Sequence, residues 1–424
     1  MIYADSDYQQ YVQVLKDELI PAMGCTEPIS IALAAAKARE TLGHLPDRLI
    51  VEVSGNIIKN VKSVVVPHTG GLRGIKAAAA AGIIVGDPSR QLEVLSRVTQ
   101  EQIAEIGKYL NSVPIEVKHK ETPYIFDIMM TAYYGKESAY VRIVEHHTNI
   151  VSVRHNDIPL LSEELPPEHT APPDHAGLSV EKIIEFADCV HIEDIQDILD
   201  RQINYNMAIA QEGLLGNYGA NIGKTLLAGH ENDVNYKMRA YAAAASDARM
   251  NGCELPVIIN SGSGNQGITT SVPVIVYAQE MQMSHTLLLR ALCVSNLITA
   301  HLKTGIGRLS AYCGAVSAGC GAAAGIAYLQ GGKYDTIAHT VVNALAMDSG
   351  IVCDGAKASC AAKIASSVDA GLLGLMMYQH GNQFFGGDGL IKKGVENTIS
   401  NIGRLARNGM QQTDKEIIRI MLEN

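Results

Sequence analysis

The sequence lacks any block of basic residues. Its 34 Lys and Arg residues stand against 44 Asp and Glu residues, which gives a net charge of −10 at pH 7. Because clustered positive charge is what binds a nucleic-acid backbone or an anionic membrane, we expect neither as a partner. The N-terminal segment also lacks a basic stretch followed by an apolar one, so no signal peptide is expected. These absences predict a cytoplasmic protein.

Acidic residues are missing from one long stretch. No Asp or Glu occurs between Met281 and Tyr334. The absence of carboxylates lowers the electrostatic free energy needed to hold an anionic cluster or a carboxylate substrate in a poorly solvated site. A buried pair of helices would exclude carboxylates equally well, so the sequence alone leaves both interpretations open. The cationic residues of this stretch are Arg290, Lys303, Arg308 and Lys333.

Cysteine is scarce, with eight residues in a chain of 424. Without an export signal these thiols should be reduced, and disulfides are not expected. Three of them lie in small-residue sequence, Cys313 in AYCGAV and Cys353 and Cys360 in VCDGAKASC. Three thiolates that converge from close-packed backbone can hold an iron-sulfur cluster and leave one iron free for chemistry. On spacing alone, buried structural cysteines explain the pattern at least as well.

Apolar sequence is abundant enough for a large core, since hydrophobic residues make up 47% of the chain. The length suggests two or three domains. We expect an α+β fold with a mostly helical catalytic domain and an inserted, β-rich α/β domain. The expected domains are 1–45, N-terminal helices packing on the catalytic domain; 46–158, the α/β domain; 159–177, a proline-rich linker; and 178–424, the helical catalytic domain.

Hydrophobic periodicity predicts the elements within these domains. Thr26 is expected to cap a helix over 27–42, and an alanine-rich helix is expected at 74–82. Runs rich in branched and aromatic residues predict strands; these are LIVEV, VKSVVV, PIEVK, YIFDIMMTAYY, SAYVRIVE and IVSVRH. After the linker, helices are predicted over 180–187, 192–212, 234–250, 274–301, 315–329, 334–347, 356–377 and 397–407.

Two glycine-rich motifs resemble nucleotide-binding loops without meeting their requirements. Residues 262–267, GSGNQG, match the dinucleotide pattern, but no acidic residue follows about twenty positions later. Residues 219–225, GANIGKT, have one residue too few between their glycines for a phosphate loop. A Gly/Ser/Asn turn still presents backbone N–H groups that can hold a small carboxylate. Ser261, Ser263 and Asn265 are therefore candidate substrate-binding residues, with an ordinary loop as the equal alternative.

Cys25 and His68 are two further candidates. Cys25 lies just ahead of a helix N-terminus, where a thiolate is favoured and can act as nucleophile, base or metal ligand. A small buried residue in a tight turn is the alternative. His68 lies where a strand meets a glycine-rich turn, from which an imidazole can reach a substrate, although lone histidines are more often polar surface or core groups.

Five ordered motifs carry a family resemblance across nearly the whole chain. They are GCTEPISIALAAAKA, HTGG, SGSGNQG, CGAVSAGCGAAAG and IVCDGAKASC. Together they resemble the L-cysteine desulfidase family and, more distantly, the iron-sulfur L-serine dehydratase α-chain. The resemblance implies a [4Fe-4S] lyase that splits L-cysteine into pyruvate, ammonia and sulfide. It also implies Cys313, Cys353 and Cys360 as cluster ligands, with Cys25 as the base or a labile fourth ligand.

One departure concerns the C-terminus. The chain ends in IRIMLEN, without the terminal cysteine that can cap the open iron in the serine dehydratases. This favours the desulfidase branch, with a small amino acid as substrate and a homodimer left open as an assembly. L-Serine dehydration is the nearest alternative, and a zinc- or amino-acid-binding protein without catalysis is a further one. The cysteines interpreted as structural are Cys189, Cys253, Cys293 and Cys320.

Overall fold

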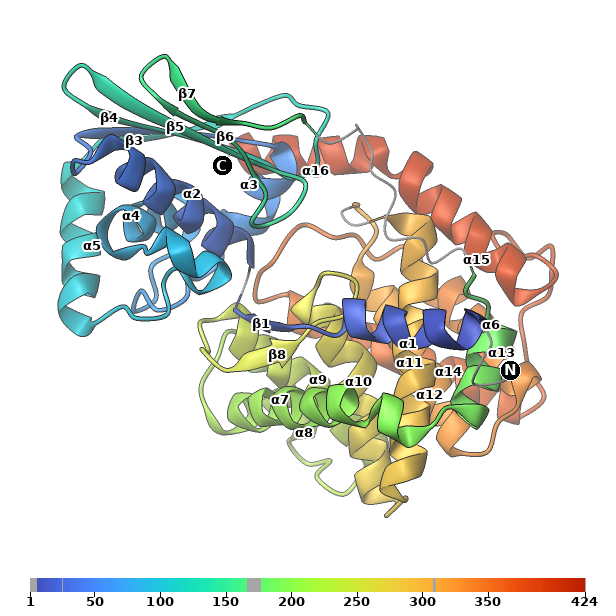
Figure 1. Cartoon of the computed structure of the whole chain (residues 1–424). Coiled ribbons are helices and arrows are strands. Elements are labelled where there is room, and N and C mark those ends of the chain that lie inside the picture. Colours follow the sequence, from blue (N-terminus) through green and yellow to red (C-terminus); the bar gives the residue numbers. More distant parts are fainter. Residues whose placement is uncertain (1–5, 25, 166–176, 308–309, 424) are drawn as a thin grey trace.

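The computed structural model describes residues 6–24, 26–165, 177–307 and 310–423. It contains a sheet region, built mainly from the first third of the chain, and a helical region built from most of the remainder (Figure 1). Each region has its own core of buried aliphatic residues and alanines. The combination of many helices with a mostly antiparallel sheet confirms the predicted α+β fold.

The sheet region is organised around six strands in the order β3-β2-β4-β5-β6-β7. Strands β2 and β3 are parallel, and all other neighbours are antiparallel. Strand β7 extends the sheet into the segment predicted as a linker, residues 159–177, most of which lies outside the described residues. The strands are β2 (Arg48–Val53), β3 (Ile115–His119), β4 (Asp127–Tyr134), β5 (Glu137–Val144), β6 (Ile150–His155) and β7 (Ile158–Ser162).

Helices cover one face of this sheet. Helix α2 (Thr26–Leu42) packs on β4, β5 and β6, while α4 (Gly74–Val85) packs on α2, and α5 (Gln100–Ser112) packs on α4. Only α1 (Ser6–Glu18) packs on the helical region, so the expectation that both N-terminal helices do so is wrong for α2. The reason is that α2 is apolar on nearly every side and needs cover on two faces.

The helical region surrounds the long helix α11. A short antiparallel pair, β1 (Pro21–Met23) with β8 (Pro256–Ile258), ties the N-terminal segment to it. Its helices are α6 (Val180–Cys189), α7 (Gln196–Leu215), α8 (Ile222–Leu227), α9 (Val234–Met250), α10 (Gly264–Glu280), α11 (His285–Ile306), α12 (Gly314–Leu329), α13 (Tyr334–Asp348), α14 (Cys360–Gln379) and α15 (Val395–Arg404). Short helical turns are η2 (Ile192–Asp194) and η3 (Leu405–Gly409) in this region and η1 (Pro88–Glu93), which packs on α2, in the sheet region.

Two predicted elements differ from the structure. The run VKSVVV, predicted as a strand, instead ends α3 (Gly55–Val61) and continues into an isolated bridge between Val65 and Arg73. The helix predicted over 274–301 is divided between α10 and α11, because Ser284 caps a new helix with its hydroxyl. Hydrophobic runs of this length do not distinguish a strand from a buried helix, nor one helix from two.

Helix α14 is long and apolar enough to cross a membrane by length and composition. However, 56% of its apolar stretch is buried inside the protein, where it packs against α9, α12 and α13. It therefore has the environment of a core helix.

Helices α12 and α14 cross closely because glycines lie at their contact. A Cβ at Gly319 would lie 2.4 Å from the Ser367 carbonyl oxygen, and a Cβ at Gly371 would lie 2.7 Å from the Gly319 carbonyl oxygen. The two backbones approach to a distance that no larger residue would permit. This crossing places the beginnings of the two helices, and the cysteines there, close together.

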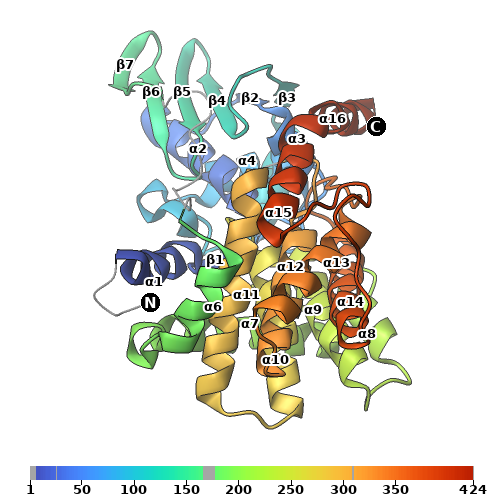
Figure 2. The same ribbon diagram turned by 90° about the vertical axis from the view of Figure 1, so that its right-hand side faces the viewer.

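The C-terminal helix α16 (Gln411–Glu423) returns to the sheet region and lies against α3 (Figures 1 and 2). A Cβ at Gly55 would lie 2.7 Å from the Ile418 Cδ1 atom. The buried Lys59 ammonium of α3 forms an ion pair with Asp414 of α16. The end of the chain thus joins the helical region to the sheet region.

Replacing Gly319 with alanine is expected to destabilise the protein, because the new methyl group would overlap the Ser367 carbonyl oxygen. Overpacking of this kind costs about 1–3 kcal/mol. Gly107→Ala is the matched control, since no atom lies within 4 Å of a Cβ there and the helix should gain up to about 1 kcal/mol. Urea unfolding followed by circular dichroism measures both; equal effects would contradict the close crossing.

Candidate active site

A short antiparallel contact brings Cys313 and Cys353 together. The residues directly before them pair as an isolated β-bridge. The Cys353 N–H donates to the Ala311 carbonyl oxygen at 2.7 Å, and the Cys313 N–H donates to the Ile351 carbonyl oxygen at 3.1 Å. Both cysteines therefore leave the same bridge, although they are distant in sequence.

Cys360 joins them from the first position of α14. Its Sγ donates to the Gly355 carbonyl oxygen at 3.5 Å. Cys313 is the N-cap residue of α12, directly before its first position. The thiols of Cys313, Cys353 and Cys360 are free and half-buried. Two helix N-termini, which favour negative charge, therefore flank the group of three.

These thiols are close enough to affect one another's ionisation. Burial, and then the charge of the Cys353 thiolate, raise the pKa of Cys313 to about 12, with a smaller contribution from Cys360. Burial and Cys353 also raise the pKa of Cys360. The raised pKa values of Cys313 and Cys360 show that this site disfavours thiolates, which a bound cation would stabilise by compensating for their charge.

A buried lysine lies near this group. Lys303 of α11 is 7% exposed, and within the described part of the chain no carboxylate pairs with it. Burial lowers the pKa of Lys303 to about 8, and the neighbouring Cys353 and Cys313 oppose that shift. Lys59 also affects Lys303, but its own charge is paired with Asp414. Arg308, from the same carboxylate-free stretch, lies outside the described residues.

The donor set of this site can be compared with known metal chemistry. Among the described residues, no three His, Cys, Asp or Glu side chains are placed to hold a single metal ion. A cluster takes its thiolates at different irons, so its ligand sulfurs stand further apart than those around one ion. Three free thiols beside a buried cation fit a cluster of this kind.

The SGSGNQG segment forms a turn that leads into α10. Ser263 caps this helix, because its Oγ accepts the Gln266 N–H at 3.4 Å. The Ser261 N–H donates to a Glu18 carboxylate oxygen at 2.6 Å, and its hydroxyl donates to Asn260 at 2.8 Å. Both serines therefore shape the turn, and their contact with a substrate stays a prediction.

Asn265 contacts Arg249, a residue that sequence reasoning missed. The Arg249 Nη1 group donates to Asn265 Oδ1 at 3.2 Å, and Nη2 donates to the Gly24 carbonyl oxygen at 2.8 Å. This arginine thus joins the predicted substrate turn to the segment that holds Cys25, which itself lies outside the described residues. The only hint of Arg249 in the sequence was a single arginine near the end of an alanine-rich segment that was predicted as a helix, YAAAASDARM.

Gln266 connects the same turn to the cysteines. Its side chain lies against Gly314, where a Cβ would be 2.6 Å from the Gln266 Cδ atom. Gly314 directly follows Cys313. Asn265 and Gln266, adjacent in sequence, therefore contact Arg249 on one side and the start of α12 on the other.

His68 lies where the two regions meet. Its Nδ1 is 3.2 Å from a Glu254 carboxylate oxygen. A pocket of about 200 Å³ is formed by the HTGG turn and the loop after α9. The neighbouring Pro67 packs against Gly24, where a Cβ would lie 2.7 Å from the Pro67 Cγ atom. His68 is thereby brought beside the segment that leads to Cys25.

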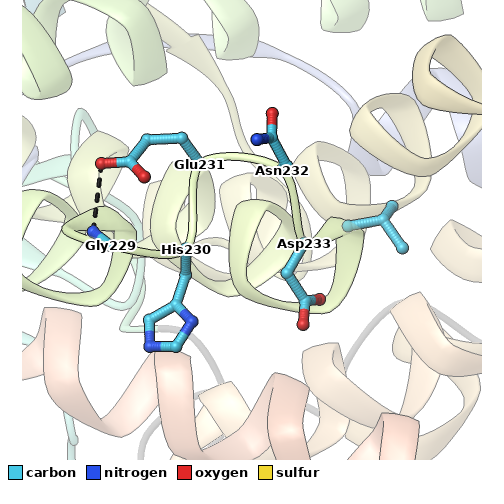
Figure 3. A pocket seen from close by; sticks show the side chains of 6 residues that line it. Gly229, His230, Glu231, Asn232 and Asp233 are labelled. Carbon is cyan, nitrogen blue, oxygen red and sulfur yellow. Dashed lines mark hydrogen bonds between the residues drawn. The ribbon is translucent and has the colours of Figure 1, made fainter.

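A second, more open hollow of about 540 Å³ lies on the loop at 229–234 before α9. Figure 3 shows its side chains diverging, with His230 and Asp233 on one side of the loop and Asn232 on the other. Glu231 accepts a hydrogen bond from the Gly229 N–H at 3.0 Å. One loop forms this hollow, and it contains none of the predicted site residues.

Comparison with known proteins places the sequence among its relatives. The family model of the serine dehydratase alpha chain matches residues 89–419. A UPF0597 protein of Desulfitobacterium hafniense is 59% identical over 99% of this chain and 97% of its own length. Those of Lachnoclostridium phytofermentans and Treponema denticola are 51% and 46% identical, over 98% and 99% of this chain and 100% and 99% of their own.

The chain belongs to the serine dehydratase alpha chain family.

Membership in this family indicates a dehydratase-like lyase, and serine dehydratase alpha chains typically depend on iron and sulfur. The predicted resemblance is thus confirmed for the iron-sulfur serine dehydratase-like family. Specificity for L-cysteine stays a prediction, because none of the three relatives carries an activity in its name. The matched residues include the SGSGNQG turn and the three cysteines, whereas His68 and Cys25 precede them.

Lys303→Met is expected to stabilise the metal-free protein at pH 7. Burial depresses the lysine pKa from 10.5 to about 8, so at pH 7 Lys303 is charged whether folded or unfolded, and the folded state carries a cost of about 3 kcal/mol. As the pH rises from 8 towards 10.5, Lys303 loses its charge in the folded protein and then in the unfolded chain, so this cost disappears. The advantage of the variant should therefore shrink between pH 7 and pH 10 in urea unfolding.

The exposed Lys333 offers the control. Lys333→Met should change the unfolding free energy by less than about 0.5 kcal/mol at either pH. A Lys303→Met protein less stable than the parent at pH 7 would show that the lysine has an anionic partner in the folded state.

Proposed function

We propose that this protein is an iron-sulfur-dependent lyase that eliminates the β-thiol of L-cysteine to give pyruvate, ammonia and sulfide. The observation that supports it is the gathering of Cys313, Cys353 and Cys360 around the beginnings of α12 and α14, close to the buried Lys303. L-Serine is the alternative substrate, and the family name favours it. The two reactions differ only in the atom that leaves.

In this proposal the three cysteines hold a [4Fe-4S] cluster. When bound, the cluster would supply one iron without a protein thiolate, a Lewis acid for the leaving sulfur. Lys303 and the two helix N-termini would offset the negative charge of the thiolates. No pyridoxal cofactor would be needed.

The remaining predicted residues would bind the substrate and move its proton. Cys25, directly after Gly24 and ahead of α2, is the proposed base for the α-proton. His68 is the proposed substrate contact from the pocket that it shares with Glu254. The turn from Ser261 through Ser263 to Asn265 would position the carboxylate at the N-terminus of α10, while the Ser261 and Ser263 N–H groups keep their bonds to Glu18 and Asn260.

The reaction balances with one water molecule. Loss of the α-proton and of the β-sulfur as hydrogen sulfide leaves aminoacrylate. This enamine tautomerises to an imine, and water then replaces the nitrogen to give pyruvate and ammonia. These last two steps need no protein group, so the protein has to assist only the elimination.

Cys313→Ala is expected to remove the brown colour, the bound iron and all pyruvate formation from anaerobically purified protein, because a ligand is lost. Cys189 gives the matched control, because it is half-buried in α6 and its thiol donates a hydrogen bond to the Phe186 carbonyl oxygen. Cys189→Ala should keep its iron and activity. Retained activity in Cys313→Ala would end the cluster proposal, and a colourless parent that contains zinc would favour the zinc-binding alternative.

L-Cysteine is expected to give a higher kcat/KM than L-serine when pyruvate is assayed with both under the same anaerobic conditions. A pocket separates thiol from hydroxyl only modestly unless it is built to hydrogen-bond one of them, so some activity on L-serine should remain. A higher kcat/KM for L-serine would instead identify a serine dehydratase. Amino-acid binding without pyruvate would identify a protein that only binds its ligand.

A further inference from the structure

Arg249 carries a buried charge without a counter-ion. It is 8% exposed, and none of the described residues pairs a carboxylate with it. Its hydrogen bonds to Gly24 and Asn265 use two of the five N–H donors of a guanidinium. The buried Nε has no partner among the described residues. Burying a charge in this state is costly unless an anion joins it.

The first turn of α10 surrounds that unsatisfied donor. A Cβ at Gly264 would lie 2.3 Å from Arg249 Nε, so only a glycine lets the guanidinium lie directly against this turn. Ser263 caps this 17-residue helix, whose N-terminus favours negative charge. The helix end and the guanidinium therefore both favour an anion at the same position.

An unsatisfied acceptor lies on the same turn. Gln266 is 6% exposed, and no described residue donates to its buried Oε1. Its side chain lies against Gly314, next to Cys313. Gln266 follows Gly264 by two residues, so the unpaired acceptor belongs to the turn of α10 against which Arg249 of α9 packs. A buried acceptor without a donor costs about 1–3 kcal/mol.

We propose that Arg249 and Gln266 together bind the charged groups of a free α-amino acid. The guanidinium receives the carboxylate, and the Gln266 carbonyl oxygen accepts a hydrogen bond from the α-ammonium group. This rests on the proposed function, to which it adds the recognition of a zwitterion. The β-substituent would then extend along Gln266 towards Cys313.

The pairing explains why both groups are left unsatisfied. A carboxylate alone would leave Gln266 Oε1 without a donor, and an amine alone would leave Arg249 without an anion. A single ligand with adjacent positive and negative groups satisfies both side chains.

Binding of L-alanine, propionate and ethylamine to anaerobically purified protein tests this pairing by calorimetry. L-Alanine has both charged groups but no leaving group, so it should bind without turnover. Arg249→Met should weaken L-alanine about 10- to 100-fold, and Gln266→Met about 3- to 10-fold. Arg239→Met is the matched control, since Arg239 lies on the same helix and is paired with Asp369; it should bind L-alanine as the parent does.

Propionate carries only the carboxylate and ethylamine only the ammonium group, so these two ligands distinguish a binding role of each side chain from a structural one. Arg249→Met should weaken propionate but not ethylamine, and Gln266→Met should do the reverse. Loss of all three ligands by the same factor in both variants would mean that the side chains only support the fold, and would overturn the proposal. So would a parent protein that does not bind L-alanine.

Two further points keep the test decisive. If Arg249→Met does not fold, Arg249→Lys, which keeps the charge but loses the planar fork, should give an intermediate loss, and Gln266→Met tests its half alone. The proposed function fails separately, through absence of iron or pyruvate. L-Alanine binding with the expected pattern in iron-free protein would support the recognition pair while contradicting the lyase.

Discussion

The distance between two helix backbones is the constraint on which the candidate site depends. Helices α12 and α14 touch at Gly319 and Gly371, where no side chain separates them. Their first residues bring Cys313 and Cys360 into one neighbourhood, and the bridge before Cys353 adds the third thiol. Because a closely packed core resists deformation, the rigid crossing of α12 and α14 also fixes the relative positions of the three cysteines.

Part of this arrangement was readable from the sequence. The small-residue flanks of Cys313, Cys353 and Cys360 predicted close-packed helices, and helix α9 begins and ends where its periodicity indicated. The placement of α2 could not be predicted, because a helix that is apolar on all sides does not reveal which core will cover it.

The contacts of Arg249 and Gln266 could not be predicted from the sequence for a different reason. They depend on segments far apart in the chain, such as Gly24 and Gly314, and no local pattern specifies which of them meet. The carboxylate-free stretch from Met281 to Tyr334 forms the buried helices α11 and α12, and it did not identify Lys303 as a cation beside the thiols. Buried charges of this kind reduce stability, which proteins accept where function needs a prepared electric field.

The return of α16 to α3 has a consequence for biosynthesis. Lys59 is made early, whereas its carboxylate partner Asp414 belongs to the final helix of the chain. During synthesis, therefore, this ammonium is expected to stay hydrated until Asp414, 355 residues further along the chain, has been made. The backbone of the Gly355 loop packs directly on Lys59, so we expect the sheet region to dock over this loop late in folding.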